Sequence, residues 1–135
     1  MSYGNHGCSG GSILSSYKYV MDFGLSLTSA YPYTAIASSC NRPTSGFKYK
    51  PDQYRVLPTN DNDALLQAVN YVPTATGLDA STLKSYSSGI ISSNCGTDLN
   101  HDMLVIGYGT YVSSSENTST DYWLLKNSWG SKWGE

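Results

Sequence analysis

Two apolar segments near the end of the sequence, separated by a polar stretch, constrain the fold more than any other feature. Residues 101–109 and 122–127 are rich in branched and aromatic side chains, which favour extended strands. The serine, asparagine and threonine residues between them have no reason to be buried. We therefore predict neighbouring antiparallel strands joined by an exposed loop. Weaker extended segments are expected at residues 53–57, 75–79 and 83–89.

Signals for two helices precede these strands. Apolar residues recur at helical spacing between Ser12, which is suited to cap a helix, and Gly24, which is suited to end one. The residues with this spacing are Ile13, Leu14, Tyr17, Val20 and Met21. Asn60 or Asp61 can cap a second helix over residues 63–71.

Charge and composition exclude several classes of function. The 135 residues carry a net charge of −2, so they offer no basic surface for a run of phosphates, and nucleic acid is not an expected partner. No segment approaches the roughly 18 consecutive apolar residues of a membrane span, so no membrane partner is expected either. Charged residues make up only 13% of the chain, and hydroxyl and amide side chains supply the polar surface instead.

Both ends of the sequence look cut. After Met1 there is neither the basic region nor the apolar core of a signal peptide, and the chain stops at Glu135 directly after an aromatic segment. No linker divides the sequence into independent parts. We therefore treat residues 1–135 as one domain that is truncated at both ends.

The cysteines and one tripeptide bear on the compartment. Cys8, Cys40 and Cys95 are an odd number, which in an oxidising compartment means a free thiol or a partner outside the chain. Three buried reduced thiols are the alternative, and they would suit a cytosolic protein. Asn117 begins an N-glycosylation tripeptide, Asn-Thr-Ser, which favours the secretory route, although such tripeptides also arise by chance.

One of the two histidines lies in a setting that suggests chemistry. His6 has no such setting and is interpreted as an ordinary surface or core residue. His101 begins one predicted strand, and Asn127 follows the partner strand with an indole, Trp129, close behind. An amide oxygen that accepts the ring N–H would fix the tautomer of the imidazole and leave its other nitrogen facing a thiol or hydroxyl.

A series of short motifs extends over nearly the whole chain. They are Gly7-Cys8-Ser9-Gly10-Gly11, Tyr31-Pro32-Tyr33, Asn100-His101, Gly107-Tyr108-Gly109, Lys126-Asn127-Ser128-Trp129-Gly130 and Trp133-Gly134-Glu135. The first motif is weak alone, whereas the last two, following a histidine strand at this spacing, are specific. In order and interval the series resembles the papain-like cysteine peptidases, the cathepsin group.

The resemblance implies an α+β, papain-like fold that is only partly present. It comprises part of the helical left domain and most of the antiparallel β right domain. It also implies a thiol protease, monomeric in the intact parent, that acts on peptide or protein substrates without a cofactor or metal ion. The parent protein would be lysosomal, vacuolar or secreted.

By resemblance, His101 is the catalytic base and acid, Asn127 orients it, and Trp129 shields their hydrogen bond from water. The nucleophilic cysteine of this family lies about 130–150 residues before the histidine and asparagine. Counting back that far from His101 passes Met1, so none of the three cysteines takes this role. We expect a fragment that lacks its nucleophile and is inactive by itself.

The resemblance also assigns the cysteines and the substrate contacts. Cys8 and Cys40 would form disulfide bonds with cysteines before this chain, and Cys95 with one beyond Glu135. Substrate-binding residues carried over by position are Gly10, Gly11, Ser12, Ile13, Gly77, Leu99, Asn100 and Asp102. Gly77 and Asp102 depart from common usage in the family, which has a larger residue and a small apolar residue there. Asp102 indicates either an acidic pocket floor, suited to a basic substrate side chain, or relaxed selection.

Two alternatives from other classes remain open. A relative whose nucleophile has been replaced would have a binding or structural role, and the position that decides this is not in the sequence. A complete small binding protein would expose an unpaired sheet edge, a recognised cause of aggregation. The presence of both His101 and Asn127 favours an active parent enzyme.

Overall fold

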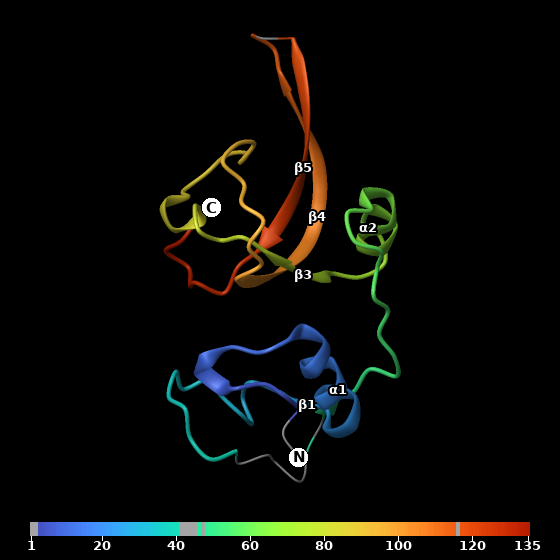
Figure 1. Cartoon of the computed structure of the whole chain (residues 1–135), viewed down its shortest axis with the longest axis vertical. Helices are drawn as coiled ribbons and strands as arrows, with labels where there is room; N and C mark the ends of the chain where they lie inside the picture. Colours follow the sequence, from blue (N-terminus) through green and yellow to red (C-terminus); the bar gives the residue numbers. More distant parts are fainter. Residues whose placement is uncertain (1–2, 41–45, 47, 116) are drawn as a thin grey trace. The chain divides into compact units, whose positions relative to one another are not determined.

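The computed structural model describes residues 3–40, 46, 48–115 and 117–135. The chain divides into two compact units, Met1–Val56 and Leu57–Glu135, and each is described by itself. The first unit contains η1 (Gly7–Ser9), α1 (Ile13–Phe23), β1 (Leu25–Ser26) and β2 (Lys48–Tyr49). The second contains α2 (Asn62–Val69), β3 (Thr74–Leu78), η2 (Leu83–Ser85), β4 (His101–Ser113) and β5 (Thr118–Lys126) (Figure 1).

Helix α1 begins and ends where the sequence predicts. Ser12 occupies the N-cap position, but its side chain forms no capping hydrogen bond. The Asn5 side chain ties the chain here instead, since its Oδ1 accepts from the Ser12 amide at 2.7 Å and its Nδ2 donates to Ser16 Oγ at 2.9 Å. Gly24 ends the helix with a φ of +75°, a conformation that side chains rarely adopt.

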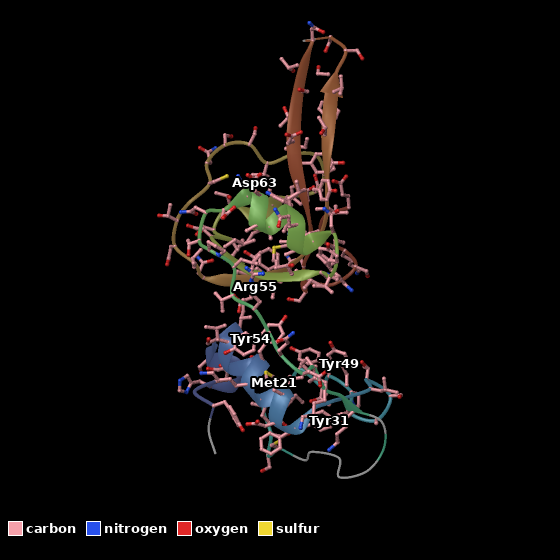
Figure 2. The ribbon with its side chains drawn as sticks, turned by 90° about the vertical axis from the view of Figure 1, so that its right-hand side faces the viewer. Met21, Tyr31, Tyr49, Tyr54, Arg55 and Asp63 are labelled. Atoms are coloured by element: carbon pink, nitrogen blue, oxygen red, sulfur yellow. The ribbon has the colours of Figure 1, made fainter. Side chains whose placement is uncertain are left out.

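The first unit is held by aromatic contacts rather than by a buried core. Tyr19 and Phe23 of α1 each pack against Tyr3. Tyr17 contacts Tyr54, which is labelled in Figure 2, with ring centroids 5.7 Å apart. None of the side chains of α1 is fully buried.

The strand predicted near residues 53–57 is wrong. That segment is irregular, and the strand that pairs with β1 is the short β2, Lys48–Tyr49. Pro51 and Pro58 flank the segment, and neither has an N–H to donate to a sheet. Residues 53–57 therefore lie outside any sheet, although their side chains favour strands.

The second unit is built on an antiparallel sheet in the order β3-β4-β5. Leu78 pairs with His101, and Leu104 pairs with Lys126, with an irregularity between Val105 and Gly107. The inner half of β4 supplies the buried core, in which Val105 is 1% exposed. The other buried apolar side chains among the described residues are Ala80, Leu83 and Met103, against which Leu78, Leu125 and Trp133 pack.

Helix α2 follows its predicted cap and lies against the sheet. Asp61 is the N-cap, and its Oδ1 accepts from the Ala64 amide at 2.9 Å. Asp63 lies in the first turn (Figure 2), where a carboxylate interacts favourably with the helix dipole. The helix ends at Val69, two residues before the predicted end.

The hairpin of β4 and β5 is longer than predicted. The polar stretch that we expected to be a loop continues both strands, and the described residues of the turn between them are 114, 115 and 117. Its threonine, tyrosine and valine residues favour strands, and Thr110 Oγ1 donates across the ladder to Asp121 Oδ1 at 2.7 Å. The predicted exposure of this stretch is confirmed. The extended segment expected at residues 83–89 is wrong, because residues 83–85 form the 3₁₀ turn η2 and residues 86–89 are irregular.

A carboxylate ties the segment before β4 to the end of β3. Asp79 accepts hydrogen bonds from the Ser81 amide at 3.0 Å, the Ser81 hydroxyl at 2.6 Å, the Asp98 amide at 3.1 Å and Asn100 Nδ2 at 3.4 Å. A Cβ at Gly96 would collide with the Asp79 carboxylate, so a larger residue there would displace that carboxylate from its hydrogen bonds. Asn100 also bonds back, since its Oδ1 accepts from the Ala80 amide at 2.9 Å. These contacts determine where the chain enters β4.

We expect Asp79→Asn to loosen this segment. Hydrogen bonds, the Ser81 hydroxyl first, hold the pKa of Asp79 below its usual value. Because the folded-state pKa is lowered, the stabilisation is present above about pH 4 and is lost as the pH falls through the folded-state pKa. Amide hydrogen exchange at Asp98 should therefore be faster in the variant at neutral pH, and in the wild type only in acid. Asp52→Asn is the control, and unchanged exchange at residues 96–100 in Asp79→Asn would contradict this role.

Candidate active site

The two strands of the hairpin bring His101 and Asn127 together. His101 is the first residue of β4, and Asn127 directly follows β5. Since Leu104 pairs with Lys126, the antiparallel register places the start of one strand beside the end of the other. Asn127 Oδ1 lies 2.9 Å from His101 Nε2, and both side chains are half-buried.

The surroundings of Asn127 determine the tautomer of the imidazole. The Ser128 amide approaches the same Asn127 atom at 2.7 Å, and a backbone N–H can only donate, so this atom is the oxygen. An oxygen of an amide only accepts, so His101 Nε2 carries the proton. In the neutral imidazole His101 Nδ1 then has the lone pair, which is the form needed to accept a proton from a thiol.

The imidazole belongs to a continuous series of ring contacts. Trp129 lies over His101 with ring centroids 4.9 Å apart, and Trp133 meets Trp129 edge-on at 5.1 Å. Trp133 is fixed in turn, since its Nε1 donates to the Leu83 carbonyl at 2.9 Å and its ring contacts Tyr86. The Trp129 indole is 37% exposed, so it forms the outer wall of the series.

Tyr86 is the last ring of this series, and Glu135 binds its hydroxyl. The Tyr86 hydroxyl donates to Glu135 Oε1 at 2.8 Å, and the Gly89 amide donates to the same oxygen at 3.3 Å. Partial burial, with a smaller contribution from the Glu135 carboxylate, raises the pKa of Tyr86. The phenol therefore remains a hydrogen-bond donor across the neutral range.

Four of the substrate residues expected from the sequence lie in the same unit as His101. Gly77 pairs with Asp102, and a Cβ at Gly77 would lie 3.6 Å from Asp102 Oδ1 and 3.9 Å from Leu99, an ordinary contact distance. Leu99 is 73% exposed. Asn100 is tied back to β3, its amide donating to the Leu78 carbonyl at 3.1 Å.

Asp102 lies on the opposite face of β4 from His101, because successive side chains of a strand alternate. It borders an open depression of about 300 Å³ that Lys126 also lines. Lys126 is therefore a candidate partner for the Asp102 carboxylate within this depression. A substrate cation would have to compete with that lysine.

The other expected substrate residues, Gly10, Gly11, Ser12 and Ile13, belong to the first unit and form its turn into α1. The Gly10 carbonyl accepts from the His6 amide at 2.8 Å, so it is already used within the chain. A Cβ at Gly11 would collide with the Asn5 side chain, which explains the glycine there. Gly11 itself is exposed.

All three cysteines are unpaired and exposed, which is evidence against three buried thiols. Cys95 is in the same unit as His101, and its thiol lies 3.8 Å from the Ser93 carbonyl. Among the described residues, no group of three or more metal-ligating side chains lies together, and no helix is long and apolar enough to cross a membrane.

Two residues that position the site were missed by the sequence analysis. Asp79 was detectable in principle, because an aspartate two residues before a serine is typical of a turn in which the carboxylate bonds the following backbone. Asn5 carried no comparable signal, since its two hydrogen bonds reach seven and eleven residues along the chain.

Comparison with known proteins agrees with this geometry. The family described as "Papain family cysteine protease" matches residues 1–135. Vignain from Vigna mungo is 38% identical over 97% of this chain, and the probable cysteine protease RDL4 from Arabidopsis thaliana is 40% identical over 97%. The chain spans only 36% of the length of each.

Solved structures agree on the fold. The Carica candamarcensis cysteine protease CMS1MS2, in complex with E-64, superposes with a TM-score of 0.85 at 34% identity, covering 98% of this chain and 59% of that one. The proform of the ragweed pollen allergen Amb a 11, a cysteine protease, superposes with a TM-score of 0.87 at 34% identity, covering 97% of this chain and 36% of that one. The α+β, papain-like fold is thus confirmed as a partial one. The chain belongs to the papain family of cysteine proteases.

Proposed function

We propose that this chain forms part of a cysteine peptidase in which His101 is the catalytic acid and base and Asn127 orients it. The observation that carries the proposal is the 2.9 Å contact between His101 Nε2 and Asn127 Oδ1, which leaves Nδ1 free for a thiol. Solved relatives bound to the inhibitor E-64 support a peptide or protein as the substrate. Asn100 would offer its carbonyl, and Gly11 its backbone, to an extended peptide.

In the proposed reaction, a thiol gives its proton to His101 Nδ1, and the thiolate attacks the scissile carbonyl carbon. The imidazolium then gives that proton to the leaving amine as the C–N bond breaks. Water attacks the thioester with His101 as base, which releases the acid and restores the thiol. The hydrogen bond to Asn127 Oδ1 holds the His101 imidazole in one orientation throughout the reaction. Trp129 strengthens this hydrogen bond by excluding water.

We infer that the thiol comes from a part of the parent protein outside residues 1–135. The family spacing between nucleophile and histidine exceeds the length of chain before His101. The exposed, unpaired thiols of Cys8, Cys40 and Cys95 suit disulfide bonds to cysteines elsewhere in that protein. Such bonds need an oxidising compartment, so we place the parent in the lysosome, the vacuole or outside the cell. Residues 1–135 would then form part of one catalytic domain.

The chain by itself is expected to lack peptidase activity, because no thiol takes the role of nucleophile. The measurement compares hydrolysis of a fluorogenic peptide by the purified chain, by its His101→Ala variant and by the full-length parent. Turnover by the parent alone is the expected result. Turnover by the chain above its His101→Ala control would contradict the proposal that the nucleophile lies outside this chain. An inactive, correctly folded parent would contradict the proposal that the parent is a peptidase.

In the parent, Asn127→Ala should lower kcat by about tenfold or more, with a smaller effect on KM. General acid–base catalysis contributes about 10²–10⁴-fold, and a misoriented imidazole loses part of it. Asn62→Ala, on the exposed first residue of α2, is the control. An unchanged kcat in Asn127→Ala would remove this residue from the mechanism.

Asp102 is proposed to favour a basic side chain two residues before the cleaved bond. Gly77 leaves room for a long side chain, and a charge-assisted hydrogen bond contributes about 1.5–3 kcal/mol. Substrates with Arg or Leu at that position are compared in the parent and in Asp102→Ala, where we expect the Arg/Leu ratio of kcat/KM to fall by about tenfold or more.

The competing partner of Asp102 is tested in the same assay. Lys126→Met removes the lysine that lines the same depression, and the Arg/Leu ratio should then rise. If the ratio stays constant in Asp102→Ala, the carboxylate does not set specificity.

A further inference from the structure

The outer half of the β4–β5 hairpin has a different character from the inner half. From Gly107 to Ser113, β4 pairs only with β5, because β3 reaches no further than Val105 along it. The outer half is therefore a two-stranded ribbon with no third strand in the described chain. Figure 1 shows it extending beyond α2 and β3.

This ribbon has almost no core of its own. Its side chains are exposed at Thr110 and at every residue from 118 to 122, and Tyr111 and Val112 are 57% and 66% exposed. Two-stranded ribbons are marginally stable in water. Beyond the hydrogen bond from the Tyr108 hydroxyl to Asn70 Oδ1 at its inner end, the described ribbon thus depends on its own cross-strand contacts, such as that between Thr110 and Asp121.

The β4 strand of the ribbon also lacks the usual protection against pairing with another chain. Natural edge strands are protected by charges, prolines or bulges, whereas residues 107–115 contain no charged residue and no proline. The bulge in β4 lies before Gly107, at the inner end. Asp121 is the one charged residue of the paired segments 107–113 and 118–124, and it is already bonded to Thr110. A ribbon of mostly threonine, tyrosine, valine and serine with such sparse charge is a template for aggregation at its free edges.

The turn at the tip of this ribbon holds Asn117, the asparagine of the Asn-Thr-Ser tripeptide. This residue is exposed and has a φ of +50°, a left-handed conformation that asparagine tolerates better than most residues. Ser119, whose hydroxyl completes the tripeptide, is exposed on the adjoining strand. A bulky polar modification at Asn117 therefore meets no packed surface of this unit.

We propose that Asn117 carries an N-linked glycan and that this glycan shields the free edges of the ribbon. Asn117 Nδ2 forms a bond to C1 of the first sugar of an oligosaccharide carried on a lipid pyrophosphate. The nitrogen loses a proton, and the lipid pyrophosphate is the leaving group. His101 is twelve residues along β4 from Ser113, about 40 Å of extended strand, so the glycan leaves the active site open.

Glycan occupancy is tested on the full-length protein secreted from a eukaryotic host. The wild type and Ser119→Thr, which preserves the tripeptide, should each gain electrophoretic mobility after peptide N-glycosidase treatment. Asn117→Gln and Ser119→Ala should show no such shift at this site, and peptide mapping of the native protein should find Asn117 converted to aspartate by the enzyme. An unmodified Asn117 peptide in the secreted protein would overturn the proposal.

The shielding is tested by self-association of the same proteins. Sedimentation should show more high-mass species for Asn117→Gln and Ser119→Ala than for the wild type and Ser119→Thr. Because the two serine variants differ in glycosylation but substitute the same residue, this comparison separates loss of the glycan from the substitution. Equal association in all four proteins would overturn the shielding. Peptidase activity should be equal in all four, so this result is independent of the mechanism proposed above.

Discussion

The hydrogen bond between His101 Nε2 and Asn127 Oδ1 depends on the register of one strand pair. His101 begins β4 and Asn127 follows β5, so the bond forms only if Leu104 stays opposite Lys126. A slip of one residue would turn every side chain of β5 to the other face of the sheet. The register is maintained by burial, since Val105 has almost no exposed surface and pairs with Leu125, which packs on the core. The position of the imidazole is thus set by packing several residues away.

The inner and outer halves of the same hairpin differ in stability and in exposure to solvent. Its inner half has a third strand and the buried core, and the candidate site lies at that end. Its outer half has neither, and most of its side chains face water. Local opening is least costly where buried apolar contacts are fewest, so motion in the outer ribbon need not disturb His101. A long exposed extension of the hairpin is therefore compatible with the register that holds His101 beside Asn127.

Local signals predicted the helices and the strand pair, because capping residues and apolar spacing act over a few residues. Asp61 and Gly24 bound their helices as expected. The outer hairpin was mistaken for a loop because threonine and serine are common in both states, and only cross-strand pairing decides between them. The spacing of the sequence motifs also indicated His101 and Asn127. The hydrogen bonds of Asp79 could not be predicted in this way, because they join residue 79 to residues 98 and 100 and depend on the tertiary fold.

The Asn127 amide has a free-energy cost that its role must offset. Its Nδ2 is buried with no hydrogen-bond partner among the described residues, and an unsatisfied buried donor costs about 1–3 kcal/mol. An apolar side chain of similar size would avoid this cost but could not accept from His101. The ring series from Trp129 through Trp133 to Tyr86 adds dispersion and keeps the site partly dry, which strengthens the bond that Asn127 does form. The aromatic enclosure around the contact between Asn127 and His101 therefore supports the role proposed for Asn127, that of orienting the imidazole.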